Sequence, residues 1–170
     1  REGVPLSPLL LGGSQEHKLR GGTENMLGIV SMGEAAQLVL ETAVERESTM
    51  AALRDSFEEL LSVVVEGCAF NGRDTARIPN TSSVYISGIR GDDLVVALDR
   101  EGILISSGAA CSSGKPEPSH VLLAMGQAEE RVRSTVRISF RADQSRELVP
   151  SVVDSIARAV KRMRVERGSI

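Results

Sequence analysis

The alternation of short strand-like and helix-like segments after residue 62 restricts the fold more than any other feature of the chain. Strand-like segments, which are short apolar runs or alternate apolar with polar residues, lie at 63–72, 81–87, 103–106 and 135–140. Helix-like segments lie at 91–102, at 118–126 and from Asp143, the expected cap, to about Val165. This order predicts an α/β fold, an α+β sandwich in which helices cover a small sheet.

A longer helical pattern precedes this alternation. Apolar residues recur at helical spacing from about Met26 to Val65, which predicts one long helix or two abutting helices. Residues 1–25 contain two Gly–Gly pairs and two prolines, and we expect them to be rich in loops. Pro150 falls inside the last helical pattern and should kink that helix or delay its start. The chain has no Trp, one Tyr and three Phe, so the core must be mainly aliphatic.

Charge and cysteine content narrow the classes of function. The formal net charge is −3 and no basic stripe interleaved with aromatic residues is present, so we expect no nucleic-acid partner. No apolar run approaches the roughly 20 residues of a membrane span and no signal peptide opens the chain, so we expect no membrane partner. Two cysteines do not make a disulfide framework, which favours a cytoplasmic location. The chain begins without an initiator methionine, and we expect a fragment, a processed chain or a trimmed one.

The segment ISSGAACSSGKPEP, Ile105 to Pro118, carries Cys111 among Ser, Gly and Ala residues. A cysteine used only for packing normally lies in an apolar core, so we expect Cys111 to be presented to solvent on a mobile loop. Serine side chains and backbone N–H groups there would favour the nucleophilic thiolate. The alternative is a surface loop that contains a cysteine by chance. The second cysteine, Cys68, has apolar neighbours and is predicted to be buried and inert.

The segment GGSQEHKLRGGTEN, Gly12 to Asn25, is a second candidate site. Its glycine-rich backbone, the hydroxyl of Thr23 and the start of the predicted helix together indicate a place for an anion such as a phosphate. The alternative is that Thr23 or Asn25 simply caps the helix.

Arg137 is the third candidate, because it lies within the apolar strand-like segment STVRISF. A buried guanidinium needs a partner, and its paired N–H donors suit a substrate carboxylate. The alternative is an arginine on an edge strand that points to water. His17 and His120 lack companion ligands at metal-binding spacing, so we expect surface or capping roles for them and no metal site.

Taken together, SSGAACSSGKPEPSHVLLAMG, GGSQEHKLRGGTENMLGIVSMGEA and STVRISF resemble the pyridoxal-phosphate-dependent cysteine desulfurases of the NifS/IscS type, which have the class V aminotransferase fold. The resemblance extends in order over nearly the whole chain. It implies that Cys111 attacks the sulfur of the substrate L-cysteine and holds it as a persulfide for a sulfur-acceptor protein, as in iron-sulfur cluster biogenesis. It also implies that Arg137 binds the substrate carboxylate and that Thr23 reaches the phosphate of the cofactor in the other subunit of a dimer.

The resemblance also implies that part of the enzyme is not in this chain. Family members are more than twice as long, and none of Lys18, Lys115 and Lys161 stands in the Ser-x-His-Lys context of the lysine that binds pyridoxal phosphate. Residues 1–40 are therefore expected to be the end of the large cofactor-binding domain, and residues 41–170 the small C-terminal domain. We expect no desulfurase activity from the chain alone; an N-terminal half or a second copy would be its partner. The alternatives are a sulfur-relay or binding module that works without pyridoxal phosphate, and an inactive structural fragment.

Overall fold

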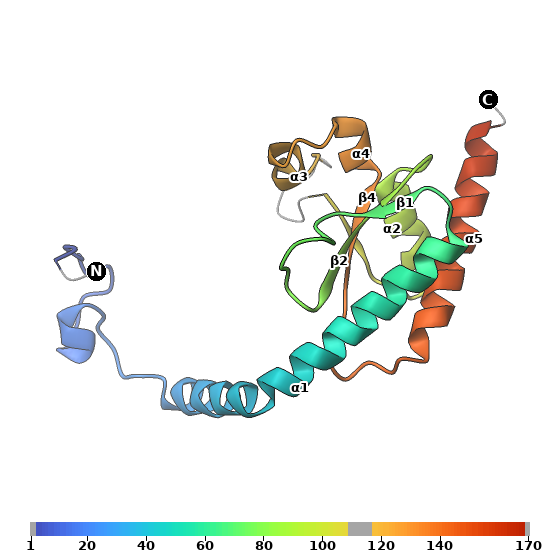
Figure 1. Ribbon diagram of the computed structural model, residues 1–170. Coiled ribbons are helices and arrows are strands. Elements are labelled where there is room, and N and C mark those ends of the chain that lie inside the picture. Colours follow the sequence, from blue (N-terminus) through green and yellow to red (C-terminus); the bar gives the residue numbers. More distant parts are fainter. Residues whose placement is uncertain (1–2, 109–116, 169–170) are drawn as a thin grey trace. The chain divides into compact units, whose positions relative to one another are not determined.

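The computed structural model describes residues 3–108 and 117–168 of the chain (Figure 1). Its elements, in chain order, are the 3₁₀ turn η1 (Gln15–Lys18), α1 (Met26–Val64), β1 (Cys68–Phe70), β2 (Thr81–Ile86), α2 (Gly91–Asp99), β3 (Ser106–Ser107), α3 (His120–Ala124), α4 (Glu129–Arg133), β4 (Thr135–Ser139) and α5 (Leu148–Gly168). The predicted long helix is therefore one helix of 39 residues.

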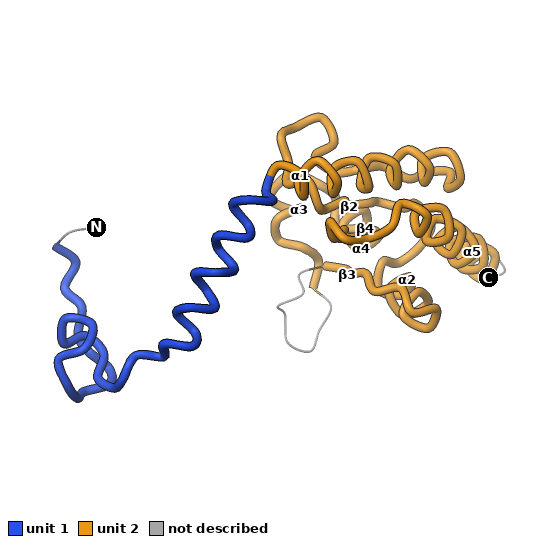
Figure 2. Tube along the Cα trace, turned by 90° about the horizontal axis from the view of Figure 1, so that it is seen from below, with its two compact units in different colours: residues 1–43 blue, residues 44–170 orange. Residues whose placement is uncertain are grey.

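The chain divides into two compact units, residues 1–43 (unit 1) and residues 44–170 (unit 2), and the division falls within α1 (Figure 2). The assignment of residues 1–40 and 41–170 to the large and small domains of an enzyme stays a prediction.

Unit 2 contains a four-stranded antiparallel sheet with the strand order β1-β2-β4-β3. Along β2 and β4 the register pairs Val84 with Val136 and Ser83 with Arg137. Because side chains alternate between the two faces of a strand, the valines face one side of the sheet, and Ser83 and Arg137 face the other. A small antiparallel sheet with helices confirms the predicted fold class.

The valine side of the sheet forms the core with helices α1, α2 and α5. The cluster contains Leu53, Phe57, Leu61, Val65, Val84, Ile86, Ile89, Leu94, Leu98, Val136, Ile138, Val149, Val153, Ile156, Ala159 and Val160. As expected, the core is mainly aliphatic. Its one fully buried aromatic ring, among the described residues, is that of Phe57, whose centroid lies 5.5 Å from that of Phe140. Burial of a side chain of this size stabilises the fold by about 2–3 kcal/mol.

The ends of several elements differ from the prediction. The last helix begins at Leu148 and not at Asp143, which confirms the delayed start predicted from Pro150, because proline fits the first turn of a helix. Asp143 instead pairs with Arg141, whose Nη2 lies 2.5 Å from its carboxylate. β3 covers Ser106–Ser107 rather than 103–106. The valines at 63–64 end α1 rather than begin a strand.

Helix α1 carries an apolar surface that is not covered in this chain. Its most apolar window of 18 residues has a mean hydropathy of 1.3, which is long and apolar enough to cross a membrane by length and composition, and none of that window is buried. The expectation of no such segment rested on unbroken apolar runs, and Glu34 and Glu41 interrupt this one. One such helix is weak evidence for a membrane, because helices that pack inside proteins meet the same criterion.

Candidate functional site

Arg137 lies on β4, an interior strand, because β4 pairs with β2 on one side and β3 on the other. The register places Ser83 of β2 and Ser106 of β3 directly beside it. Its side chain is exposed on the face of the sheet opposite the core, and within the described residues it makes no hydrogen bond or ion pair. The arginine is exposed but lies on an interior strand, so the edge-strand alternative is wrong, and its binding of a carboxylate stays a prediction. Its guanidinium is available to a ligand.

A cleft of about 320 Å³ opens beside Arg137. The sheet side of the cleft is polar, with Asn71, Ser83 and Thr135 next to the guanidinium, and α3 contributes the apolar side chains of Val121 and Leu122. A polar wall with an exposed guanidinium, facing an apolar wall, suits a small ligand with one anionic end. Ser119, which also borders the cleft, caps α3 as predicted by accepting a hydrogen bond from Leu122 N over 3.5 Å.

Asn71 and Ser83 are joined by two hydrogen bonds at this wall. The backbone N–H of Asn71 donates to the carbonyl of Ser83 over 2.9 Å, and Asn71 Nδ2 donates to Ser83 Oγ over 3.1 Å. The other side-chain atom, Asn71 Oδ1, is buried and has no partner in the part of the chain that the structure describes. Neither residue was predicted from the sequence. Two signals in the sequence point to them. An Asn-Gly pair follows an apolar strand, and the alternation along the next strand places Ser83 on the face away from the core.

A buried charged pair holds the connection between β1 and β2, which carries Asn71. Glu58 of α1 is fully buried and accepts two hydrogen bonds of 2.7 Å from Arg77 and one of 2.6 Å from Ser82. The hydrogen bond to Glu58 raises the pKa of the Arg77 guanidinium. A buried carboxylate without a partner strongly destabilises a fold. The ion pair between Glu58 and Arg77 therefore holds the β1–β2 connection against α1. The sequence did not predict this pair, because a single Glu within an apolar helical pattern does not indicate a buried partner.

Cys111 lies in residues 109–116, outside the described residues, so its predicted exposure stays a prediction. The described residues on either side meet, because a Cβ atom built on Gly108 would lie 2.9 Å from the carbonyl oxygen of Glu117. Gly108 also has a φ of +59°, which favours glycine. Since Gly108 borders the cleft beside Arg137, the chain enters the cysteine segment at that cleft.

Thr23 belongs to unit 1, where two Gly–Gly pairs shape the preceding loop. Gly21 N–H donates to the carbonyl of Leu10 over 2.9 Å, and a Cβ atom on Gly21 would lie 2.7 Å from the backbone of Gly12. The glycines are thus needed for a close backbone crossing. Asn25 caps α1, since its side chain accepts a hydrogen bond from Gly28 N over 3.1 Å, and the Thr23 side chain is left exposed.

The remaining candidates from the sequence take no part in this cleft. His17 is exposed in η1, and His120 is exposed at the first position of α3. Among the described residues, no group of three or more His, Cys, Asp or Glu side chains is placed to hold a metal ion. Cys68 is half-buried on β1 rather than buried, and desolvation raises the pKa of its thiol. A raised pKa disfavours the reactive thiolate.

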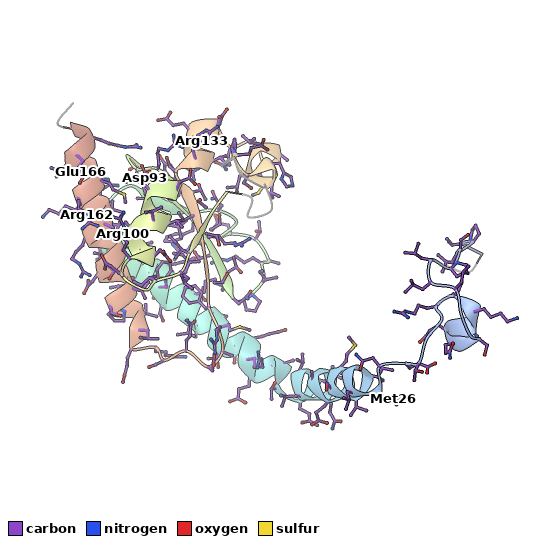
Figure 3. The ribbon with its side chains drawn as sticks, turned by 180° about the vertical axis from the view of Figure 1, so that it is seen from behind. Met26, Asp93, Arg100, Arg133, Arg162 and Glu166 are labelled. Atoms are coloured by element: carbon purple, nitrogen blue, oxygen red, sulfur yellow. The ribbon has the colours of Figure 1, made fainter. Side chains whose placement is uncertain are left out.

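A second cleft in unit 2, of about 650 Å³, lies between α2 and α5. Asp93 of α2 and Arg100, the residue that follows α2, contribute to it, and Arg162 and Glu166 do so from α5 (Figure 3). Arg167 Nη2 lies 3.7 Å from Asp93 Oδ2, which adds an exposed ion pair across the two helices. The charges of both signs are mixed here, so the cleft favours no ligand of one charge.

Comparisons with known proteins place these residues in a family context. The profile of the family described as Aminotransferase class-V matches residues 11–152. The chain is 40% identical over 167 residues to a cysteine desulfurase of Nostoc sp. (strain PCC 7120 / SAG 25.82 / UTEX 2576), covering 96% of this chain and 41% of the relative. It is 38% identical over 161 residues to the putative cysteine desulfurase IscS 1 of Bacillus subtilis (strain 168), covering 94% of this chain and 42% of the relative.

Solved structures give the same result. The chain matches a NifS-like protein from Rickettsia africae ESF-5 with a TM-score of 0.78 and 26% identity, covering 93% of this chain and 41% of that one. It matches a second NifS-like protein with a TM-score of 0.76 and 32% identity, covering 95% of this chain and 40% of that one. The chain therefore spans about two fifths of the length of the relatives that it matches.

Proposed function

This chain belongs to the aminotransferase class-V family, and from that membership we propose that it is the C-terminal part of a cysteine desulfurase. The reaction proposed for the parent enzyme converts L-cysteine to L-alanine and retains the sulfur as a persulfide. The relatives named above carry the name cysteine desulfurase, which supports this choice within the family.

The observation that carries the proposal is Arg137 on the wall of its cleft. The guanidinium is exposed, has no partner among the described residues and stands beside two serines on a rigid sheet. A carboxylate can accept two parallel N–H bonds from such a group. Arg137 would therefore bind the α-carboxylate of L-cysteine and fix the position of its sulfur.

Cys111 would be the residue that takes the sulfur. It is three residues from Gly108, and three extended residues span about 10 Å, so it is tied to the cleft that Gly108 borders. The Cys111 thiolate would attack the sulfur of the substrate, forming an S–S bond while the substrate's C–S bond breaks. The electron pair of that bond stays on carbon, which takes a proton and becomes the methyl group of L-alanine. The outer persulfide sulfur would then pass to an acceptor protein.

The family implies pyridoxal phosphate as cofactor, and this chain has groups for only one end of it. The exposed Thr23 hydroxyl and the neighbouring glycine backbone match the donors that a phosphate needs. Lys18 and Lys161 are exposed on η1 and α5, and Lys115 lies outside the described residues, so the amine that binds the cofactor is assigned to another part of the protein. Bound there, pyridoxal phosphate would supply the electron sink that weakens the C–S bond of cysteine. A dimer in the cytoplasm is proposed on the resemblance alone.

Steady-state kinetics of the parent protein, the polypeptide or complex that contains these residues, test the proposal. With dithiothreitol present to reduce the persulfide, we expect sulfide and alanine in equal amounts from L-cysteine. Arg137→Ala should lower kcat/KM by about a hundredfold, because a charge-assisted bidentate contact is lost. Arg141→Ala, an exposed arginine outside the cleft, is the matched control and should leave kcat/KM unchanged. A wild-type parent protein that releases no sulfide would refute the proposal.

The second function is a sulfur relay, which uses the same cysteine segment and needs no lysine in the Ser-x-His-Lys context; none of the three lysines of the sequence stands in that context. In that case Cys111 would accept a persulfide sulfur from another enzyme. Incubation of the chain with a complete desulfurase and ³⁵S-labelled cysteine, followed by mass analysis of the peptide with Cys111, separates the two functions. Transfer without any bound cofactor supports the relay, and no transfer removes it.

A further inference from the structure

The face of the sheet that carries Arg137 holds a second hydrogen-bond donor for a ligand. Ser83 stands directly opposite Arg137 in the register of β2 and β4, and both line the same cleft. Side chains of directly paired residues lie roughly 4.5–5.5 Å apart at Cβ. A planar carboxylate bound to the guanidinium is therefore within reach of the serine hydroxyl.

The hydrogen bond from Asn71 fixes the role of that hydroxyl. Asn71 Nδ2 donates to Ser83 Oγ over 3.1 Å, so the serine oxygen already accepts one bond and its own O–H remains to be donated. The backbone bond from Asn71 N to Ser83 O, 2.9 Å long, holds the two residues in this relation. The arrangement gives the cleft a hydroxyl donor next to a guanidinium.

The other hydroxyl on this wall is committed elsewhere. Thr135 Oγ1 donates to the carbonyl of Arg131 over 2.8 Å and is buried. The guanidinium of Arg131 in turn lies over the ring of Tyr85, 4.3 Å from its centroid. Ser106 of β3 also stands beside Arg137 but does not line the cleft. Of the two strand hydroxyls that line it, Ser83 is therefore the one whose proton is free for a ligand in the described part of the chain.

We propose that Ser83 is a second substrate-binding residue, which donates a hydrogen bond to the carboxylate held by Arg137, and that Asn71 is a positioning residue for Ser83. This inference rests on the proposed function and deepens it. It assigns specificity for the α-carboxylate to Arg137, Ser83 and Asn71, which lie side by side across the sheet. Asn71 Oδ1, buried and without a protein partner, faces no competing donor in the described residues.

The test measures recognition of the carboxylate in the cofactor-loaded parent protein. L-Alanine and L-alaninol, in which a CH₂OH group replaces the carboxylate, are titrated while the absorbance of the cofactor is followed. For Ser83→Ala, the Kd for L-alanine and the KM for L-cysteine should rise about tenfold, the effect of one hydrogen bond to a charged group. The Kd for L-alaninol and kcat should stay within about twofold. Unchanged alaninol binding also shows that the variant is folded.

Three variants complete the test. Ser83→Thr keeps the hydroxyl and should restore most of the discrimination between the two ligands. Asn71→Ala should reduce it about threefold, because Ser83 loses its orientation and not its donor. Ser139→Ala removes an exposed serine of β4 outside the cleft and should behave as wild type.

The inference is wrong if Ser83→Ala binds L-alanine as tightly as Ser139→Ala does, or if alanine and alaninol weaken equally. Its failure differs from a failure of the proposed function. If only the inference fails, the wild-type protein desulfurates cysteine and discriminates between the two ligands, and Ser83→Ala does so equally well. If the proposed function fails, the wild-type protein releases no sulfide, and the inference fails with the function on which it rests.

Discussion

The two units of the chain differ sharply in how their apolar side chains are used. In unit 2 the apolar faces of α1, α5 and the sheet close on one core, in which Phe57 and Leu61 are fully buried. In unit 1 the one residue classed as buried is Gly21 among the residues described, and Leu27 and Leu40 are 85% and 80% exposed. The same helix, α1, contributes to both units.

This difference shows that a helical apolar pattern predicts that a helix forms. It does not predict whether the same chain buries the apolar face of that helix. The amino half of α1 is apolar over most of its surface, whereas the carboxyl half presents one face to a sheet that the chain itself supplies. Since the chain spans about two fifths of its relatives, we predict that the remaining part of such a protein covers the apolar residues of unit 1. Unit 2 needs no such cover for its core.

Hydrogen exchange of the isolated chain should give the largest contrast between the units. Amides of α1 around Leu53 and Leu61 should open only by global unfolding, whereas those between Leu27 and Leu40 should open locally. The difference in exchange rate should be at least about a thousandfold. Equal protection along the whole helix would show that the unit boundary has no energetic meaning.

Paired truncations of apolar side chains sharpen the comparison in free energy. Phe57→Ala should lower the free energy of unfolding of unit 2 by about 3–5 kcal/mol, because it opens a cavity in a closed core. Leu40→Ala in unit 1 should change it by less than about 0.5 kcal/mol, as expected for an exposed residue. Urea unfolding followed by circular dichroism measures both. A large loss from Leu40→Ala would contradict the account of unit 1.

The buried charged pair of unit 2 provides a third contrast, now between polar groups. Glu58→Ala should destabilise the fold by about 3 kcal/mol, because it leaves Arg77 largely buried without its carboxylate. The matched control is Glu129→Ala, which removes the exposed pair of Glu129 with Arg133 and should cost about 0.5 kcal/mol or less. Urea midpoints compare the two. Similar losses from both variants would mean that the burial of Glu58 carries no energetic weight.

The smallest expected effect is the pH dependence of two surface carboxylates in unit 2. The hydrogen bond from Arg141 holds the pKa of Asp143 below its ordinary value, and bonds with Ser155 and then Arg158 do the same for Glu101. Because the folded pKa is the lower one, the stability that these groups contribute is present above the unfolded pKa and is lost as the pH falls through the folded pKa.

Titration of the side-chain carboxyl carbons by NMR checks this sign. The pKa of Asp143 should return to its ordinary value in Arg141→Ala, with that of Glu101 unchanged. A pKa of Asp143 that is the same in the variant and the wild type would remove Arg141 as the cause.

How far the sequence predicts the fold depends on the range of each interaction. Helical spacing predicted α1, and the Ser119 cap of α3 was correct, because both depend on neighbours a few residues away. Asp143 was wrong as the cap of α5, because it pairs with Arg141 instead, whereas the delayed start predicted from Pro150 was correct. The five-residue helix α4 is mostly charged and has no apolar period to detect.

The site shows the same limit. An arginine within an apolar strand was visible in the sequence, but its place beside Ser83 depends on the β2–β4 register, which joins residues far apart in the chain. Asn71 and Glu58 were missed for that reason. The roles of Cys111 and Thr23 came from the resemblance and stay predictions.

The central claim is that Cys111 takes the sulfur of cysteine beside the carboxylate site of Arg137. Mass spectrometry of the parent protein after a single turnover with ³⁵S-labelled L-cysteine tests it most directly. The account predicts one labelled sulfur on the peptide that contains Cys111, unchanged in Cys68→Ser and absent in Cys111→Ser. Label on Cys68, or a protein that forms sulfide as fast in Cys111→Ser as in the wild type, would contradict it.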